Sequence, residues 1–338
     1  MPSLSDTMTA EANLLRDIID SCENFVITTH IHPDGDAVGS SLALYQFLRN
    51  SNKQVHIFTP DSIPPSLHFL PHVEDCIPFD RQPSALADVI QGAEVLFCLD
   101  FNTLKRTGDS MAEVLKTFRG KKILIDHHLQ PDPDFELSFS DVTFCSTSEL
   151  LFAVLREAYP DISWLTASMA ICLYTGILTD SGSFRFESVT PRTHRVIADL
   201  LEAGARHTDI HEALFDQNRP QRFKLMAAML GHLTYPLQSV VYSWITEDEF
   251  NRSGAEKDDS EGFVNIGLSV RGIVVSALFR EEGDRVRISF RSKGEVDVNQ
   301  YARKHFNGGG HRNAAGGTWY GTLQQCISRF ENTVGELV

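Results

Sequence analysis

Short apolar runs and longer amphipathic stretches alternate over the first 145 residues of the chain. The apolar runs are rich in β-branched residues and read FVITTH (25–30), QVHIFTP (54–60), VLFCLD (95–100) and KILIDHH (122–128). The stretches between them, such as AVGSSLALYQFLRN (37–50) and GDSMAEVLKTFRG (108–120), have apolar residues at helical spacing. Strands that alternate with helices are typical of βαβ units. The pattern therefore predicts an α/β domain with a doubly wound, mostly parallel sheet covered by helices on both faces.

The pattern becomes helical from about residue 146 to 215 and then returns to strands after residue 237. Residues 216–230 are predicted to form a linker helix. The later apolar runs are QSVVYSWIT (238–246), GFVNIGLSV (262–270), GIVVSALFRE (272–281) and RVRISFRSK (285–293), and we predict each as a strand. We expect helices around residues 298–306 and 322–337. The prediction is a domain over 1–215, the linker helix, and a smaller α+β domain over 231–338, with a cleft between the domains.

Acidic and histidine residues follow several of these apolar runs. His30, Asp34 and Asp36 lie in HIHPDGD directly after the first run, and Asp100 ends VLFCLD. Asp126, His127 and His128 follow KILI, and Asp180 follows the apolar GIL. Carboxylates are costly to gather beside apolar strand ends unless cations compensate them, and divalent metals are the usual partners of such mixed sets. Asp100 or Asp180 alone would fit a helix cap or a turn, so the metal prediction depends on the whole set.

Composition and charge narrow the classes of function. The apolar content of 42% is ordinary for a globular protein, and no apolar run approaches the roughly 18 residues of a membrane span. A net charge of −15 argues against a protein that coats long nucleic acid, since such binding needs a basic surface. The six cysteines are scattered without a CxxC pair, which favours free thiols in a reducing compartment. We therefore expect a cytoplasmic protein with neither long duplex nucleic acid nor membrane as partner.

Glycines and cations near the end of the chain indicate a second, anion-binding element. GGGHRNAAGG (308–317) places Gly309, Gly310 and His311 in what we predict to be a glycine-rich loop opening a helix of small residues. Glycines let backbone amides approach a phosphate closely. Arg291 in RISFRSK and Arg106, which follows Asp100 by six residues, are candidate phosphate ligands. These residues suggest a small anionic substrate.

Taken together, HxxPDGD, the strand-terminal Asp, DHH and TDSGSF resemble the motifs of the DHH phosphoesterase superfamily, which includes RecJ nucleases and family II pyrophosphatases. GGGHRNAAGG resembles the signature of the DHH-associated C-terminal domain. In length and motif order the chain is most similar to the nano-RNase/pAp-phosphatase branch, the bifunctional oligoribonucleases. The two resemblances cover nearly the whole chain.

This resemblance implies a role for each motif residue. His30 and Asp34 would bind one metal ion, Asp36, His127 and Asp180 would bind a second, and Asp100 would bridge the two. Asp126 would orient the histidine pair, and His128 would face the substrate phosphate. The resemblance also implies that Arg291 and Ser292 line the substrate groove and that His311 reaches the active site. Apart from the resemblance, Arg106, Gly309 and Gly310 are expected to contact a substrate phosphate. Two Mn²⁺ ions per site are expected, with Mg²⁺ as the alternative.

The expected function is a metal-dependent phosphodiesterase that degrades very short oligoribonucleotides to mononucleotides. It would also remove a phosphate from 3′-phosphoadenosine 5′-phosphate (pAp), with water activated by two metal ions as the nucleophile. Linear or cyclic dinucleotides remain an alternative substrate within the same chemistry. A family II-type pyrophosphatase and an inactive nucleotide-sensing protein are further alternatives. A homodimer remains open.

Overall fold

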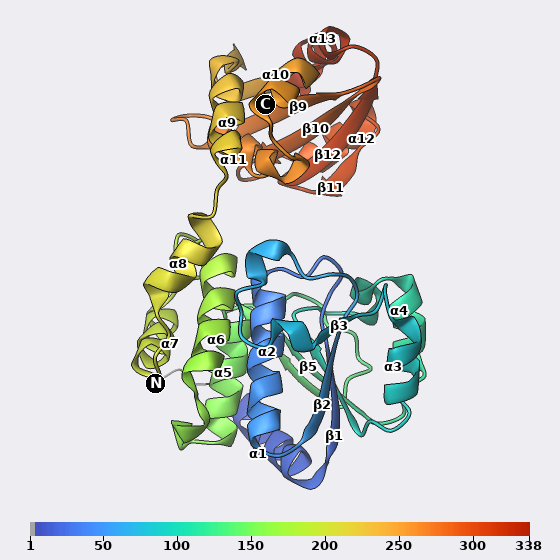
Figure 1. Ribbon diagram of the computed structural model, residues 1–338, viewed down its shortest axis with the longest axis vertical. Helices are drawn as coiled ribbons and strands as arrows, with labels where there is room; N and C mark the ends of the chain where they lie inside the picture. Colours follow the sequence, from blue (N-terminus) through green and yellow to red (C-terminus); the bar gives the residue numbers. More distant parts are fainter. Residues whose placement is uncertain (1–3) are drawn as a thin grey trace. The chain divides into compact units, whose positions relative to one another are not determined.

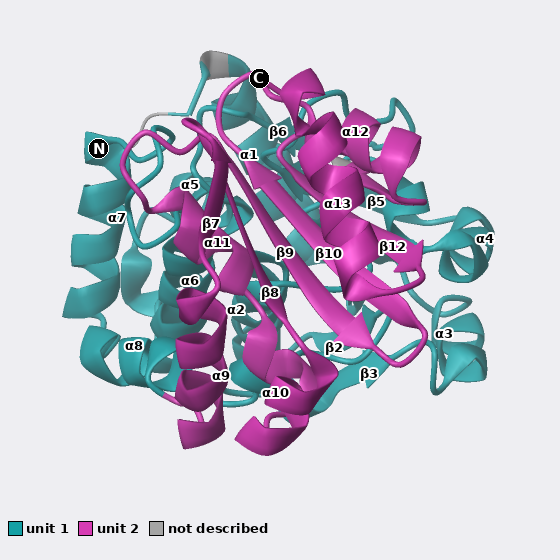
Figure 2. Cartoon of the chain, turned by 90° about the horizontal axis from the view of Figure 1, so that it is seen from above, with its two compact units in different colours: residues 1–216 teal, residues 217–338 magenta. Residues whose placement is uncertain are grey.

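The computed structural model describes residues 4–338, apart from the side chains of Asp6 and His311. This part of the chain divides into two compact units, residues 1–216 and 217–338 (Figure 2). Each has its own sheet and its own hydrophobic clusters. The two units are described separately below.

Unit 1 is built on a parallel sheet that contains six strands within the described residues. The strand order is β3-β2-β1-β4-β5-β6, and every neighbouring pair is parallel. The strands are β1 (Asn24–Thr28), β2 (Gln54–Thr59), β3 (Cys76–Pro78), β4 (Val95–Leu99), β5 (Lys121–Asp126) and β6 (Leu137–Ser140). The chain order reverses between β1 and β4, and ligands of such sheets bind outside the carboxyl edge at that point.

Helices cover both faces of this sheet (Figure 1). The helices of unit 1 are α1 (Asp6–Ser21), α2 (Gly35–Asn50), α3 (Pro83–Val89), α4 (Asp109–Lys116), α5 (Thr147–Ala158), α6 (Ala167–Asp180), α7 (Pro191–Glu202) and α8 (His207–Phe215). Phe97 and Leu99 of β4 point into the cluster with α1, α2, α5 and α6, whereas Leu96 and Cys98 point into the cluster with α3 and α4. Successive strand residues therefore fill opposite cores, and the predicted doubly wound α/β fold is confirmed.

Two glycines let the helices α2, α5 and α6 pack closely. A Cβ on Gly39 of α2 would lie 2.4 Å from the carbonyl oxygen of Cys172 in α6, and one on Gly176 would lie 2.0 Å from Ser148 Oγ in α5. Both positions therefore require glycine. The close packing brings the first turn of α2, the first turn of α5 and the last turn of α6 together at the carboxyl edge of the sheet.

Unit 2 has a mixed sheet, with six strands in the described part of the chain in the order β11-β12-β10-β9-β8-β7. The strands are β7 (Thr234–Leu237), β8 (Val240–Ile245), β9 (Val275–Glu282), β10 (Arg285–Ser292), β11 (Gly309–His311) and β12 (Ala314–Tyr320). The pair β8–β9 is parallel, and the other pairs are antiparallel. The helices are α9 (Pro220–Gly231), α10 (Glu247–Ser253), α11 (Phe263–Leu268), α12 (Val298–His305) and α13 (Leu323–Thr333).

Two segments of unit 2 differ from the sequence prediction. GFVNIGLSV forms helix α11, not a strand, because Phe263, Val264 and Gly267 are buried on one helical face that packs against β9. The glycine-rich segment 308–317 does not open a helix. It forms the antiparallel pair β11–β12, in which Gly310 lies opposite Ala315. In unit 1 the sequence prediction missed β3 and β6, which are short and only partly apolar.

Within residues 4–338, no helix has the length and apolar character needed to cross a membrane. The six cysteines are all free thiols in this same part of the chain, and all but Cys76 are buried.

Candidate metal centre

The predicted ligands of unit 1 meet at the carboxyl edge of its sheet, where the strand order reverses. His30 follows β1, Asp100 follows β4, and His127 follows β5. Asp34 caps α2 through its Oδ1, which accepts hydrogen bonds from the amides of Asp36 (3.0 Å) and Ala37 (3.1 Å). Asp180 is the last residue of α6. The site is therefore assembled from strand ends and helix ends, not from strand ends alone.

Among the described residues, three overlapping groups place ligand atoms within 4.8 Å of one another. The groups are His30–Asp34–Asp100, Asp36–His127–Asp180 and Asp100–His127–His128. Asp100 belongs to two of them, and so does His127. The structure thus gathers all the residues proposed as metal ligands and adds His128 to their neighbourhood.

Asp100 lies at the centre of these contacts. Its Oδ2 is 3.4 Å from His30 Nε2, and its Oδ1 is 3.6 Å from His127 Nε2. His127 Nε2 is also 3.3 Å from Asp180 Oδ2. The two oxygens of Asp100 therefore face different histidines, which is the arrangement that a carboxylate needs in order to bridge two ions.

The backbone of Asp100 is in the left-handed region, with φ of 64°. Asp tolerates this conformation better than most residues, but it still carries strain. Such strain is often found at functional sites, where the surrounding structure holds it. The turn at Asp100 aims the carboxylate across the sheet edge toward β1 and β5.

Burial and crowding disfavour the charged forms of these carboxyl groups in the absence of cations. Asp36 is fully buried, and its burial raises its pKa. The pKa of Asp100 is held well above its usual range, first by burial of Asp100 and then by the nearby Asp36 carboxylate. Burial, then the charges of Asp36 and Asp34, raises the pKa of Asp180 to about 8. In the described chain Asp100 forms ion pairs with imidazoles and with no lysine or arginine. Added positive charge would stabilise this cluster.

The Nδ1 atom of each of the three histidines His30, His127 and His128 lies close to an oxygen of the protein. His30 Nδ1 lies 2.9 Å from the carbonyl oxygen of Ile31, and His127 Nδ1 lies 3.3 Å from that of Phe144. A carbonyl at Nδ1 fixes the proton there and leaves Nε2 free as a metal ligand. His128 differs, because its Nδ1 lies 2.6 Å from Asp126 Oδ1. This hydrogen bond raises the pKa of His128.

Sequence reasoning missed the contribution of α5. The backbone amides of Thr147 and Ser148 donate hydrogen bonds to Asp36 Oδ2 (2.6 Å) and Oδ1 (2.9 Å), and the Thr147 hydroxyl donates one to Asp100 Oδ1 (2.9 Å). These residues lie in no acidic motif. The helix-start sequence Ser146–Glu149 was the available signal, since Ser146 caps α5.

Arg106 lies in the 3₁₀ turn Leu104–Thr107 near the same edge. Its carbonyl oxygen accepts a hydrogen bond from the amide of Ile31, 2.8 Å away, and its positive charge acts to lower the pKa of His128. The remaining predicted substrate residues all belong to unit 2.

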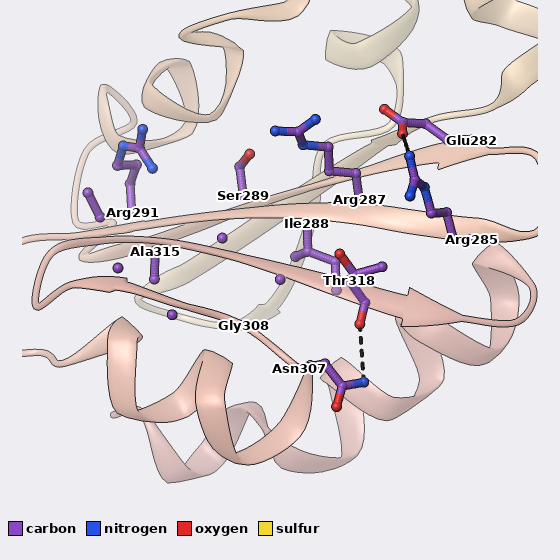
Figure 3. Close-up of a pocket in the computed structure, with 15 residues that line it drawn as sticks. Glu282, Arg285, Arg287, Ile288, Ser289, Arg291, Asn307, Gly308, Ala315 and Thr318 are labelled. Carbon is purple, nitrogen blue, oxygen red and sulfur yellow. Dashed lines mark hydrogen bonds and ion pairs between the residues drawn. The ribbon is translucent and has the colours of Figure 1, made fainter. Parts of the chain in front are cut away.

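In unit 2 an open cavity of about 670 Å³ lies on one face of the sheet beside β10 and β12 (Figure 3). Arg287, Ser289 and Arg291 extend from the same side of β10, because they alternate with buried residues. The backbones of Gly309 and Gly310 line the cavity as well. The cavity thus combines guanidinium groups with exposed backbone, which suits an anion.

Ser292, another predicted substrate residue, is not among the described residues that line this cavity. Ser292 is buried, and its hydroxyl donates a hydrogen bond to the carbonyl oxygen of Val296 (2.7 Å) and accepts one from Asn313 (2.9 Å). Gly310 has φ of 145°, and a Cβ there would lie 2.5 Å from the carbonyl oxygen of Ala314, so this position requires glycine for the close strand pairing. The backbone of His311 ends β11, but its side chain lies outside the described part of the structure.

The donors of unit 1 fit divalent cations. They are carboxylates and imidazoles without thiolates, a set that suits manganese or magnesium better than a structural zinc site. The buried, crowded carboxyl groups lack nearby lysine or arginine partners in the described residues, so bound cations are the natural counter-charge.

Comparisons with known proteins agree with this geometry. Residues 24–177 match the model of the DHH family N-terminal domain, and residues 237–337 match the DHHA1 domain. The bifunctional oligoribonuclease and PAP phosphatase NrnA of Thermus thermophilus is 34% identical over 92% of this chain and 89% of its own length. The protein of the same name from Bacillus subtilis is 28% identical over 88% of this chain and 90% of its own length.

Solved structures show the same architecture. An exopolyphosphatase-related protein from Bacteroides fragilis has a TM-score of 0.89 and 34% identity, covering 99% of this chain and 98% of that one. Exonuclease RecJ bound to manganese has a TM-score of 0.52 at 12% identity and covers all of this chain and 96% of its own, a likeness of fold alone. On the family match, the relatives and the shared fold, the chain belongs to the DHH family, with a DHHA1 domain as its second part.

Proposed function

We propose that this protein is a phosphoesterase that hydrolyses very short oligoribonucleotides to mononucleotides and removes phosphate from pAp. The observation that carries the proposal is the set of overlapping carboxylate–histidine groups around Asp100. The relatives named oligoribonuclease and PAP phosphatase, which match along most of their own length, support the choice of substrate. The complete ligand set argues against an inactive sensing protein.

In this proposal two divalent cations occupy the edge of the sheet in unit 1. His30 and Asp34 would hold one ion, Asp36, His127 and Asp180 would hold the other, and Asp100 would contact both. When bound, such cations lower the pKa of a water molecule and stabilise negative charge on phosphoryl oxygens. Manganese is proposed as the native ion, with magnesium as the alternative, because the donors are oxygen and imidazole and because RecJ, which has the same fold, was solved with manganese.

The chain supplies proton transfer and phosphate binding around that centre. His128 is held at Nδ1 by Asp126, so its Nε2 is left for the substrate. The hydrogen bond to Asp126 raises the pKa of His128, which increases the share of imidazolium near neutral pH. His128 can therefore donate a proton to the phosphate or to the leaving oxygen. Arg106 would add a fixed positive charge for the phosphate.

Unit 2 would bind the nucleotide portion of the substrate. Arg291 and the backbones of Gly309 and Gly310 line its cavity and present groups that bind anions. His311 and Ser292 are proposed to complete this contact. We also propose the domain ranges 1–215 and 231–338, joined by residues 216–230 as a linker helix. The acidic chain, with a net charge of −15, would repel long polyanions and so favour short substrates.

The free thiols suit a reducing compartment, and we propose the cytoplasm as the location. A homodimer remains an open proposal.

A direct test incubates the protein and manganese with 5′-labelled RNA of two to twenty nucleotides, and separately with pAp. We expect mononucleotides from the shortest RNAs and orthophosphate from pAp. Cyclic di-AMP and pyrophosphate are run in parallel as the alternative substrates. If cyclic di-AMP or pyrophosphate is turned over faster than both RNA dimers and pAp, the proposed substrate class is wrong. If no substrate is turned over, the proposal that this protein is a phosphoesterase is wrong.

A further inference from the structure

The segment Phe144–Ser148, which leads into the first turn of α5, contacts residues of three different motifs. The Phe144 carbonyl oxygen lies 3.3 Å from His127 Nδ1. The amides of Thr147 and Ser148 bind both carboxylate oxygens of Asp36. Thr147 and Ser148 are fully buried although both are polar, and these hydrogen bonds satisfy their backbone amides.

Thr147 makes the contact that matters most, because it joins two carboxylates. Its backbone amide donates to Asp36 Oδ2 at 2.6 Å, and its hydroxyl donates to Asp100 Oδ1 at 2.9 Å. Asp36 belongs to the group with His127 and Asp180, whereas Asp100 belongs to the group with His30 and Asp34. One residue therefore connects the two groups proposed to hold the two cations.

The hydroxyl also decides how the Asp100 carboxylate is turned. The terminal torsion of an Asp side chain is broad, so a carboxylate without a donor can rotate. The bond from Thr147 holds Oδ1 on the side of His127, 3.6 Å away, and leaves Oδ2 on the side of His30, 3.4 Å away. A bridging carboxylate must keep this orientation in order to serve both ions.

A buried ion pair fixes the segment itself. Glu149 is fully buried, its Oε2 accepts a hydrogen bond from the amide of Cys145 (2.9 Å), and its Oε1 lies 3.1 Å from Arg192 Nε of α7. The Arg192 guanidinium lies 3.5 Å from the ring centre of Phe144 and donates to the carbonyl oxygen of Thr143 (2.6 Å). Arg192 of α7 therefore contacts residues at both ends of this segment, namely Thr143 and Phe144 at its start and Glu149 after it.

We propose that Thr147 is a positioning residue that sets the geometry of the paired cation site through its hydroxyl bond to Asp100. Thr147 is not one of the proposed metal ligands, and in this proposal it acts through the two carboxylates that it joins. The inference rests on the metal centre of the proposed function. Loss of hydrogen-bonding partners behind metal ligands typically weakens metal affinity by about 10- to 100-fold.

The test measures Mn²⁺ binding to the metal-free full-length protein, by calorimetry and by loss of the electron paramagnetic resonance signal of free Mn²⁺. Thr147→Val removes the hydroxyl but keeps the shape and the backbone amide. We expect it to weaken Mn²⁺ binding by about 10- to 100-fold. Thr147→Ser keeps the hydroxyl and should bind Mn²⁺ within a few-fold of the wild type.

Thr175→Val is the matched control, since Thr175 is equally buried but its hydroxyl bonds to the carbonyl oxygen of Ile171 in its own helix. We expect normal Mn²⁺ affinity from it. Thr147→Ala replaces the valine variant if circular dichroism shows that valine does not fold. Wild-type affinity in Thr147→Val, or equal weakening in Thr147→Ser, would overturn the positioning role. A wild-type protein that binds no Mn²⁺ would instead overturn the metal centre itself, so the two failures are distinguishable.

Discussion

The carboxyl edge of the sheet in unit 1 and the arginine-bearing face of the sheet in unit 2 are opposites in charge and in construction. At the first, Asp36 and Asp100 are buried and crowded by further carboxylates. At the second, Arg287 and Arg291 extend into an open cavity beside strands rich in glycine. The first arrangement is unfavourable until cations arrive, whereas the second is solvated and ready for an anion. The comparison suggests that metal binding and substrate binding are separable tasks of the two units.

The strongest test of this separation is Asp100→Asn. The amide keeps the shape of the side chain and tolerates the left-handed backbone, but it removes the charge that would bridge two ions. We expect turnover of every substrate to fall by at least about 10²-fold, measured on RNA dimers and on pAp. The metal-free variant should be no less stable than the wild type in urea, because a crowded carboxyl group is gone. Near-normal turnover in Asp100→Asn would contradict the bridging role of Asp100. Asp100→Ala removes the carboxyl group altogether and should abolish turnover.

Added metal should protect one unit and not the other. Cations that bind only the folded form at 100 times their dissociation constant stabilise it by about 2.7 kcal/mol. Hydrogen exchange read peptide by peptide should show this protection around β4 and α2 and no change in β9 and β10. Chelation with EDTA should reverse the effect. Equal protection of both sheets would break the comparison.

Substitution in unit 2 should alter substrate binding alone. Arg291→Gln removes a half-buried guanidinium from the cavity, and we expect KM for pAp to rise about tenfold, the scale of one charge-assisted hydrogen bond. Neither kcat nor Mn²⁺ affinity should change appreciably. Arg252→Gln is the control, because Arg252 of α10 does not line this cavity and its Nη2 lies 2.7 Å from Asp248 Oδ2. A loss of Mn²⁺ affinity in Arg291→Gln would show that the two tasks are coupled.

The stability of the metal-free protein should also depend on pH. The pKa of Asp180 is about 8 in the folded state, above the value of roughly 3.9 for an unfolded aspartate. The folded chain therefore keeps a proton that the unfolded chain has lost, and stability falls as the pH rises from about 4 to about 8. Urea midpoints in EDTA should fall less steeply over this range for Asp180→Asn than for the wild type. Identical slopes would contradict a raised pKa at Asp180.

The two units also differed in how far their sequences could be interpreted. In unit 1 the central strand β4 lies in a parallel sheet buried on both faces, so it is apolar throughout, and the polar residue Asp100 marks its end. In unit 2 the run 262–270 is similarly rich in apolar residues, but it forms the helix α11. Periodicity alone cannot separate a short buried strand from a short buried helix. The segment packs as α11 against β9, where a Cβ on Gly267 would lie 2.2 Å from Ser276 Oγ, and this packing is not visible in the local sequence.

By itself, the sequence determined the fold of unit 1 and the residues that meet at its carboxyl edge, because strand ends in a parallel sheet share one edge wherever they lie in the chain. Tertiary structure alone decided that Asp180 arrives from a helix end, that the glycines after Phe306 pair as strands, and that Thr147 joins Asp36 to Asp100. These contacts connect residues far apart in sequence, and their free energy depends on packing that no local pattern encodes. The proposed ligands could be predicted from the sequence, but the contacts that hold them in place could not.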